Sequence, residues 1–167
     1  MNQTVQDRPS QDNAEPRIAV ISAGWHAEIV AKGRESLLAE LARQGWPRER
    51  VDLVEVPGAF EIPLLAQQLA RRRQHVAIVA IALVVDGGIY RHEFVASAVI
   101  DGLMRVMLDT GVPVLSCVLT PRAFHEHREH QRFFAEHMLT KGAEAARACM
   151  QVLKQQRALQ VHDTVPA

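Results

Sequence analysis

Three short segments of the sequence carry side chains that could bind a small polar ligand. Trp25 offers an indole ring, which can stack on a flat heterocycle or can pack over the start of a helix. Glu61 lies in the string Val-Pro-Gly-Ala-Phe-Glu-Ile-Pro at 56–63, where its carboxylate can contact a ligand or cap the next helix. Gly87 and Gly88 can direct backbone N–H groups at an anion, although an ordinary turn has the same composition. The residues alone leave both interpretations of each segment open.

Histidines are dense in the last third of the chain. His125, His127, His130 and His137 fall in one segment that the periodicity predicts to be helical, and His92 follows the glycine pair. A zinc site would favour histidines at i and i+4 with a carboxylate behind them, and the sequence has no such pair. The pattern favours a polar, partly exposed helix, and leaves open that one imidazole carries charge against an anionic substrate near neutral pH.

Composition and motif spacing argue against several classes of protein. The 167 residues include 19 basic and 19 acidic side chains, so the chain lacks the basic excess that usually accompanies nucleic-acid binding. The glycine pair matches neither the Walker A motif nor the dinucleotide fingerprint, which disfavours ATP and NAD. The longest apolar run, 76–85, is too short to span a bilayer, and residues 1–16 lack the apolar core of a signal peptide. We expect a cytoplasmic protein without nucleic-acid or membrane partners.

The chain has two cysteines, Cys117 and Cys149, which form no Cys-x-x-Cys motif. Two distant thiols make neither a disulfide framework nor a zinc site. Both lie among apolar residues, so we expect buried and unreactive thiols.

Apolar periodicity alternates between strands and helices along most of the chain. Short aliphatic runs predict strands at 17–21, 51–56, 76–85 and 114–119. Helical spacing predicts helices at 26–44, 62–73, 92–110, 123–138 and 140–161. This alternation is typical of a three-layer α/β/α fold with a central four-stranded parallel sheet. We expect one domain at 17–162, a flexible N-terminal tail at 1–16 and a C-terminal tail at 163–167.

Ligands of such folds bind beyond the carboxyl ends of the strands. The loops expected there are 22–26, 57–61, 86–92 and 120–127. They contain the tryptophan, the glutamate and the glycine pair, so one ligand site at this edge of the sheet would use all three.

Together these segments resemble the lumazine synthase family of riboflavin biosynthesis. The resemblance is carried, in the family's order, by Val-Pro-Gly-Ala-Phe-Glu-Ile-Pro at 56–63, Gly-Val-Pro-Val at 111–114, Val-Leu-Thr at 118–120 and Lys-Gly-Ala-Glu-Ala-Ala at 141–146. Each string alone is a weak signal, whereas the ordered set within 18–152 is specific. The resemblance implies a flavodoxin-like fold assembled into pentamers, and an enzyme that requires no cofactor and no metal.

The resemblance also implies the reaction. A transferase of this family condenses 5-amino-6-(D-ribitylamino)uracil with 3,4-dihydroxy-2-butanone 4-phosphate to 6,7-dimethyl-8-ribityllumazine, releasing phosphate and water. The alternative is a non-catalytic carrier that binds lumazine or flavin on the same fold. An unrelated flavodoxin-like signalling or flavin domain is a third hypothesis, disfavoured because no paired carboxylates follow the first strand.

Site roles follow from the same resemblance. The pyrimidine and its ribityl chain would contact Trp25, Ala59, Phe60, Glu61, Leu83, Val84, Val85 and Ser116. The phosphate would contact Gly87, Gly88, Ile89, His130 and Lys141. The expected catalytic residues are His92, which would transfer protons, and Arg91, which would hold phosphate if proton transfer is substrate-assisted.

Several positions depart from the usual family pattern. Asp86 stands where a basic residue is common, Ser116 replaces a large aromatic, and His130 replaces the phosphate-binding arginine. Arg91 occupies the column of the proton-transferring histidine, and His92 comes one position later. These changes resemble a second subclass that forms decamers from two pentamers. Because a neutral imidazole binds phosphate less strongly than a guanidinium, we expect a lower apparent affinity for the butanone phosphate.

Overall fold

A parallel sheet of four strands lies at the centre of the structure, a computed structural model that describes residues 15–88, 91–122, 124 and 127–163. The strands are β1 (Arg17–Ala23), β2 (Val51–Val56), β3 (His75–Leu83) and β4 (Val114–Leu119). They lie in the order β2-β1-β3-β4, and each neighbouring pair is parallel. Flavodoxin-like folds begin with this strand order, so the predicted sheet is confirmed.

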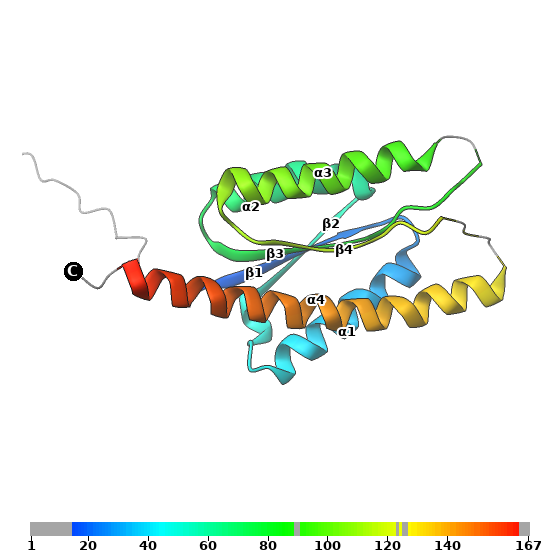
Figure 1. Ribbon diagram of the computed structural model, residues 1–167. Helices are drawn as coiled ribbons and strands as arrows, with labels where there is room; N and C mark the ends of the chain where they lie inside the picture. Colours follow the sequence, from blue (N-terminus) through cyan, green and yellow to red (C-terminus); the bar gives the residue numbers. More distant parts are fainter. Residues whose placement is uncertain (1–14, 89–90, 123, 125–126, 164–167) are drawn as a thin grey trace, which may run out of the picture.

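Helices cover both faces of the sheet, as Figure 1 shows. One face carries α1 (Ala27–Arg43) and α4 (Arg128–Asp163), and the other carries α2 (Ile62–Arg71) and α3 (His92–Thr110). Two short 3-10 helices, η2 (Arg48–Arg50) and η3 (Ala59–Glu61), precede β2 and α2. The three-layer α/β/α architecture expected from the alternating pattern is therefore confirmed.

Most of the predicted element limits agree with the structure to within two residues, and those of β2, α3 and β4 agree fully. One prediction is wrong. The helices expected at 123–138 and 140–161 form a single helix, α4, which begins at Arg128. The segment around Thr140 contains no proline, and the hydroxyl of Ser36 on α1 donates a hydrogen bond to the Leu139 carbonyl. Packing against α1 thus supports the helix where the sequence suggested a break.

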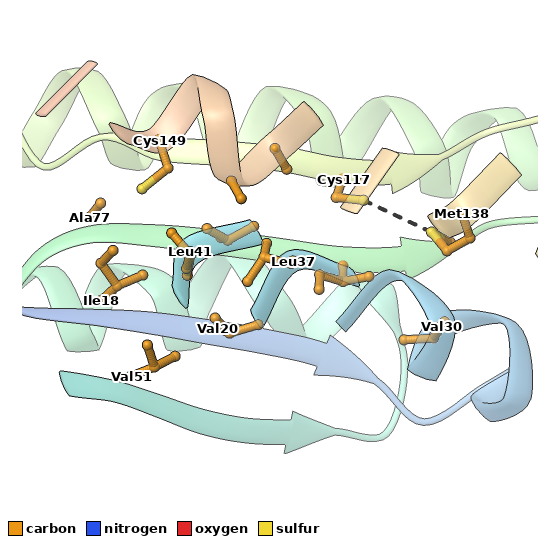
Figure 2. Close-up of a cluster of buried hydrophobic side chains, with 14 of the residues drawn as sticks. Ile18, Val20, Val30, Leu37, Leu41, Val51, Ala77, Cys117, Met138 and Cys149 are labelled. Carbon is orange, nitrogen blue, oxygen red and sulfur yellow. Dashed lines mark hydrogen bonds between the residues drawn. The ribbon is translucent and has the colours of Figure 1, made fainter. Parts of the chain in front are cut away.

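Apolar side chains form a core on each face of the sheet. Successive residues of β1 alternate between them, so that Ile18 and Val20 face α1 and α4 whereas Ala19 and Ile21 face α2 and α3. Figure 2 shows the first of these cores, in which both cysteines are buried as expected. Burial raises the pKa of the Cys117 thiol to about 11 and that of Cys149 to about 12, which keeps both thiols protonated at neutral pH.

Two glycines allow α1 and α4 to touch through their backbones. A Cβ atom at Gly142 would overlap the Gly33 carbonyl oxygen and lie 2.9 Å from the carbonyl carbon. A Cβ at Gly33 would lie 2.8 Å from Cγ of Met138. The crossing of these helices therefore depends on the missing side chains.

The Gly142→Ala variant tests this crossing. Alanine is favoured over glycine in a helix by about 1 kcal/mol, but the overlap with Gly33 forces the helices apart and costs about 1–3 kcal/mol or more. We expect a net loss of stability, measured as a lower urea midpoint at fixed protein concentration. Gly87→Ala is the control, because a Cβ at Gly87 would have no atom within 4 Å. A Gly142→Ala protein as stable as the parent would contradict the close crossing.

A charged cluster joins the first residues of three strands, at the edge of the sheet opposite to the predicted site. The Arg17 guanidinium donates to Asp52, with Nε 2.8 Å from Oδ2, and Nε2 of His75 lies 2.9 Å from the same oxygen. The hydrogen bond from Arg17, followed by the one from His75, lowers the pKa of Asp52 from 3.8 to about 2. The ionised carboxylate thus links β1, β2 and β3.

This cluster predicts a pH dependence of stability. Because the folded-state pKa of Asp52 lies below its ordinary value, the stabilisation is present above about pH 4 and is lost as the pH falls toward about 2. Asp52→Asn should therefore destabilise the protein at pH 7, and the difference from the parent should shrink between pH 4 and 2. Urea unfolding at several pH values measures the difference, with Glu136→Gln, which removes an exposed ion pair to Arg132, as the control. A difference that does not change with pH would contradict the assignment.

Candidate functional site

A cavity of about 190 Å³ opens at the carboxyl ends of the strands. We call it the strand-end cavity. Seven of the eight residues predicted to contact the pyrimidine and ribityl groups line it: Trp25, Ala59, Phe60, Glu61, Leu83, Val84 and Val85. The other lining residues are His26, Pro57, Gly58 and Val95. The structure thus brings together three loops that are distant in the sequence.

The loop after β1 positions Trp25 at the cavity. The Gly24 N–H donates to the Val56 carbonyl oxygen at 2.8 Å, which holds the end of β1 against the end of β2. The indole is 62% exposed, so it is not a buried packing residue. Its carbons would lie 3.7–3.8 Å from a Cβ at Gly58, so the absent side chain leaves one face of the cavity open beside the ring. This arrangement leaves room for a flat ligand against the indole.

Glu61 shapes the loop between β2 and α2. Its Oε2 atom accepts a hydrogen bond from the Gly58 N–H at 2.9 Å, so the carboxylate caps the short helix η3. It makes no side-chain capping bond to α2, the helix that the sequence suggested it would cap. Phe60, next to it, is 63% exposed and lines the cavity. The capped loop therefore holds an aromatic ring at the cavity without burying it, and contact of Glu61 with a ligand remains a prediction.

The loop of the glycine pair differs from an open anion cradle. The Gly88 N–H donates to Oδ1 of Asp86 at 2.8 Å, so this amide already has a carboxylate partner. Gly88 has a φ of 70°, which favours glycine, and Gly87 is exposed. Ile89, the third residue predicted to bind phosphate, lies outside the described residues.

The two predicted catalytic residues, His92 and Arg91, lie in different surroundings. His92 is the first residue of α3 and is 8% exposed, with Nδ1 3.6 Å from Oε2 of Glu93. It borders a separate depression of about 400 Å³, together with Thr120 and Arg122. The Arg91 guanidinium instead lies 4.5 Å above the exposed ring of Phe94. The imidazole is therefore held in the fold, whereas the guanidinium lies on the surface of α3.

The remaining predicted residues do not line the strand-end cavity formed by the described part of the chain. Ser116 is exposed on β4. Lys141, on α4, donates to Oε2 of Glu144 at 2.7 Å. His130, also on α4, contacts the rings of Phe124 and Phe134. A single copy of the chain thus separates these residues from the cavity.

Two of the additional lining residues show the limits of sequence reasoning. His26 directly follows Trp25 in a strand-end loop, a position that could have been used to find it. Val95 lies inside α3 and offers no such signal. Pro57 and Gly58 belong to the string that already pointed to this loop.

The described residues contain no group of three or more histidine, cysteine, aspartate or glutamate side chains arranged to hold a metal ion. No helix in this part of the chain is long and apolar enough to cross a membrane.

The fold and the cavity define a flavodoxin-like α/β protein with a largely apolar cavity at the strand ends. Comparison with known proteins identifies its family. The sequence profile of 6,7-dimethyl-8-ribityllumazine synthase matches residues 15–157. The chain is 58% identical over 143 residues to 6,7-dimethyl-8-ribityllumazine synthase of Rhodococcus erythropolis, and this alignment covers 86% of this chain and 92% of that protein. It is 50% identical over 159 residues to 6,7-dimethyl-8-ribityllumazine synthase 2 of Pseudomonas syringae pv. tomato, and this alignment covers 95% of this chain and 94% of that protein. The chain belongs to the 6,7-dimethyl-8-ribityllumazine synthase family.

Proposed function

We propose that this enzyme of riboflavin biosynthesis binds 5-amino-6-(D-ribitylamino)uracil in the strand-end cavity. It condenses this pyrimidine there with 3,4-dihydroxy-2-butanone 4-phosphate to give 6,7-dimethyl-8-ribityllumazine. The observation that carries the proposal is the convergence in one cavity of seven residues expected to contact the pyrimidine and its ribityl chain. No observation favours the non-catalytic carrier.

The cavity suits the flat, polar pyrimidine. Trp25 and Phe60 offer exposed aromatic rings, and the apolar residues Leu83 and Val84, at and just after the end of β3, also line the cavity. The reaction forms an imine between the pyrimidine amine and the ketone with loss of water, eliminates phosphate, closes the second ring and loses water again. Since the amine is already a nucleophile, much of the acceleration comes from holding the two substrates together.

His92 is the proposed proton-transfer residue. An imidazole has one nitrogen that can accept a proton and one that can donate it, so it can serve both imine formation and ring closure. Its position at the start of α3 is fixed by burial, whereas Arg91 lies over Phe94 and can reach an anion from the surface. We assign proton transfer to His92 and phosphate contact to Arg91, Gly87, Gly88, Ile89, His130 and Lys141.

The proposed site is completed by a second copy of the chain. In the described part of the chain, Ser116, His130 and Lys141 do not line the cavity of their own copy, so this proposal has them contact the substrate from a neighbouring copy. The α3 helix supplies an apolar surface for one, because Ile100, Met104 and Leu108 are exposed on one stripe of that helix. A net charge of zero adds no repulsion between copies.

We accordingly propose a pentamer that pairs into a decamer. The homologues whose names carry the number 2, among them that of Pseudomonas syringae pv. tomato, support a second subclass. A cytoplasmic location, expected from the sequence, stays a prediction.

The function and the role of His92 are tested by following product absorbance after both substrates are mixed with the protein. His92→Ala should lower kcat by about 10²–10⁴-fold, the usual contribution of general acid–base catalysis, with KM for the pyrimidine within about twofold. If His92→Ala has an unchanged turnover, another residue must transfer the protons. Arg91→Ala is the matched comparison, because it removes the other predicted catalytic side chain. No product above the spontaneous background in the parent protein would reject the enzyme itself.

Light scattering tests the assembly. We expect a particle of five or ten times the 18.6 kDa chain mass. Leu108→Glu puts a charge on the apolar stripe of α3 and should reduce the mass toward that of the monomer, with loss of activity. Leu159→Glu is the control, because Leu159 is similarly exposed but lies near the end of α4. A monomeric parent protein would contradict the shared site.

A further inference from the structure

His26 has an unusual backbone conformation. It lies in the left-handed region, with φ 54° and ψ 42°, directly before α1. Histidine tolerates this region better than most residues but still adopts it rarely. Among the described residues other than glycine, Arg73 alone shares a positive φ, and it lies in the turn before β3 at the opposite edge of the sheet. Such conformations persist where the surroundings hold them, and they concentrate at functional sites.

Two sets of contacts hold His26 in this conformation. Its carbonyl oxygen accepts hydrogen bonds from the N–H groups of Ile29 and Val30, each at 3.0 Å, and so starts α1. Its ring meets the ring of Phe124 edge to face, with centroids 5.3 Å apart and planes at 66°. Phe124 is 8% exposed and lies between β4 and α4. An edge-to-face pair has a preferred geometry, so this contact fixes the direction of the imidazole.

His26 also separates two hollows of the surface. It lines the strand-end cavity beside Trp25, and it lines a groove of about 470 Å³ between the first turns of α1 and α4. Lys32 on α1 and Arg132 on α4 also line this groove. His26 therefore belongs to the lining of both hollows.

Trp25 is held by its two neighbours in the chain. On one side, Gly24 is bonded to Val56 at the end of β2. On the other, His26 is anchored to Phe124. The indole is 62% exposed and lies beside Gly58, where no side chain can grip the ring, so these two backbone attachments contribute to its direction.

We infer that His26 is a positioning residue for the pyrimidine substrate. Its ring contact with Phe124 fixes the backbone on the α1 side of Trp25, and this sets the indole face on which the pyrimidine stacks. The inference rests on the proposed function, because it presumes that the cavity binds the pyrimidine. His26 acts through Trp25 and takes no part in proton transfer.

The first experiment separates the ring from the backbone. His26→Asn keeps a side chain that tolerates the left-handed conformation but removes the imidazole, and Phe124→Leu removes the partner ring. Each variant should raise KM for 5-amino-6-(D-ribitylamino)uracil by about fivefold or more with kcat within about twofold, the pattern of weakened substrate binding. Phe133→Leu is the matched control, because Phe133 contacts Phe134 and His137 in the same aromatic cluster, with no ring contact to His26. Its KM should be unchanged.

The double variant tests whether the two rings act as one unit. If they do, His26→Asn combined with Phe124→Leu raises KM no further than the larger single effect. If the double variant instead raises KM by the product of the two single effects, the inference is overturned. It is also overturned by a His26→Asn protein with KM within about twofold of the parent, or by one whose loss is confined to kcat.

A second measurement does not depend on catalysis. The chain has two tryptophans, so a Trp46→Phe background leaves Trp25 as the single indole fluorophore. In that background, His26→Asn should show faster depolarisation of Trp25 fluorescence, and Phe133→Leu should not. Unchanged depolarisation in His26→Asn overturns the inference even if the enzyme is active. Absence of product with the parent protein rejects the proposed function instead, and leaves the fluorescence result to decide whether His26 orients Trp25.

Discussion

The burial of β3 on both faces of the sheet is the constraint on which the rest of the structure depends. Residues from Ala77 to Ala82 have no exposed surface, so helices must cover both faces and no ligand reaches the strand from either side. The edges of β3 are occupied by β1 and β4. The strand becomes accessible where Leu83 and the two residues after it border the cavity. The location of the site at the carboxyl ends follows from this burial.

Glycine and proline residues at the boundaries explain which element limits could be predicted. Gly111 and Pro113 separate α3 from β4, and Pro57 ends β2, so these limits are encoded by the residues at the boundary. The continuity of α4, by contrast, does not depend on residues at a boundary. Gly142 is a poor helix residue by propensity, yet it lies inside the helix because its missing side chain admits the backbone of Gly33 on α1. A contact between residues so far apart in the sequence cannot be read from periodicity.

The same distinction applies to the site. Seven cavity residues could be predicted, because the strand-end rule and one specific string placed them in the right loops. Val95 could not, since it reaches the cavity only through the packing of α3 against the sheet. The hydrogen bond from the Gly88 N–H to Asp86 could not be predicted either, because it depends on the path of the loop. The residues that line the cavity could therefore be predicted from the sequence better than the hydrogen bonds that they make.

Exposed aromatic rings distinguish the side chains that fold this chain from those available to other molecules. The largest fully buried side chains are aliphatic or methionine, whereas Trp25, Phe60 and Phe94 are each more than 60% exposed. Burying such a ring is worth about 1.5–3 kcal/mol, and folding of one chain leaves most of this unused. Trp25 and Phe60 border the cavity, so a flat ligand can cover them. Phe94 lies on α3 beneath Arg91, where another copy of the chain can cover it. In the proposed enzyme, substrate binding and assembly would both bury apolar area that folding of one chain leaves exposed, and this would link the activity of the proposed site to the proposed oligomer.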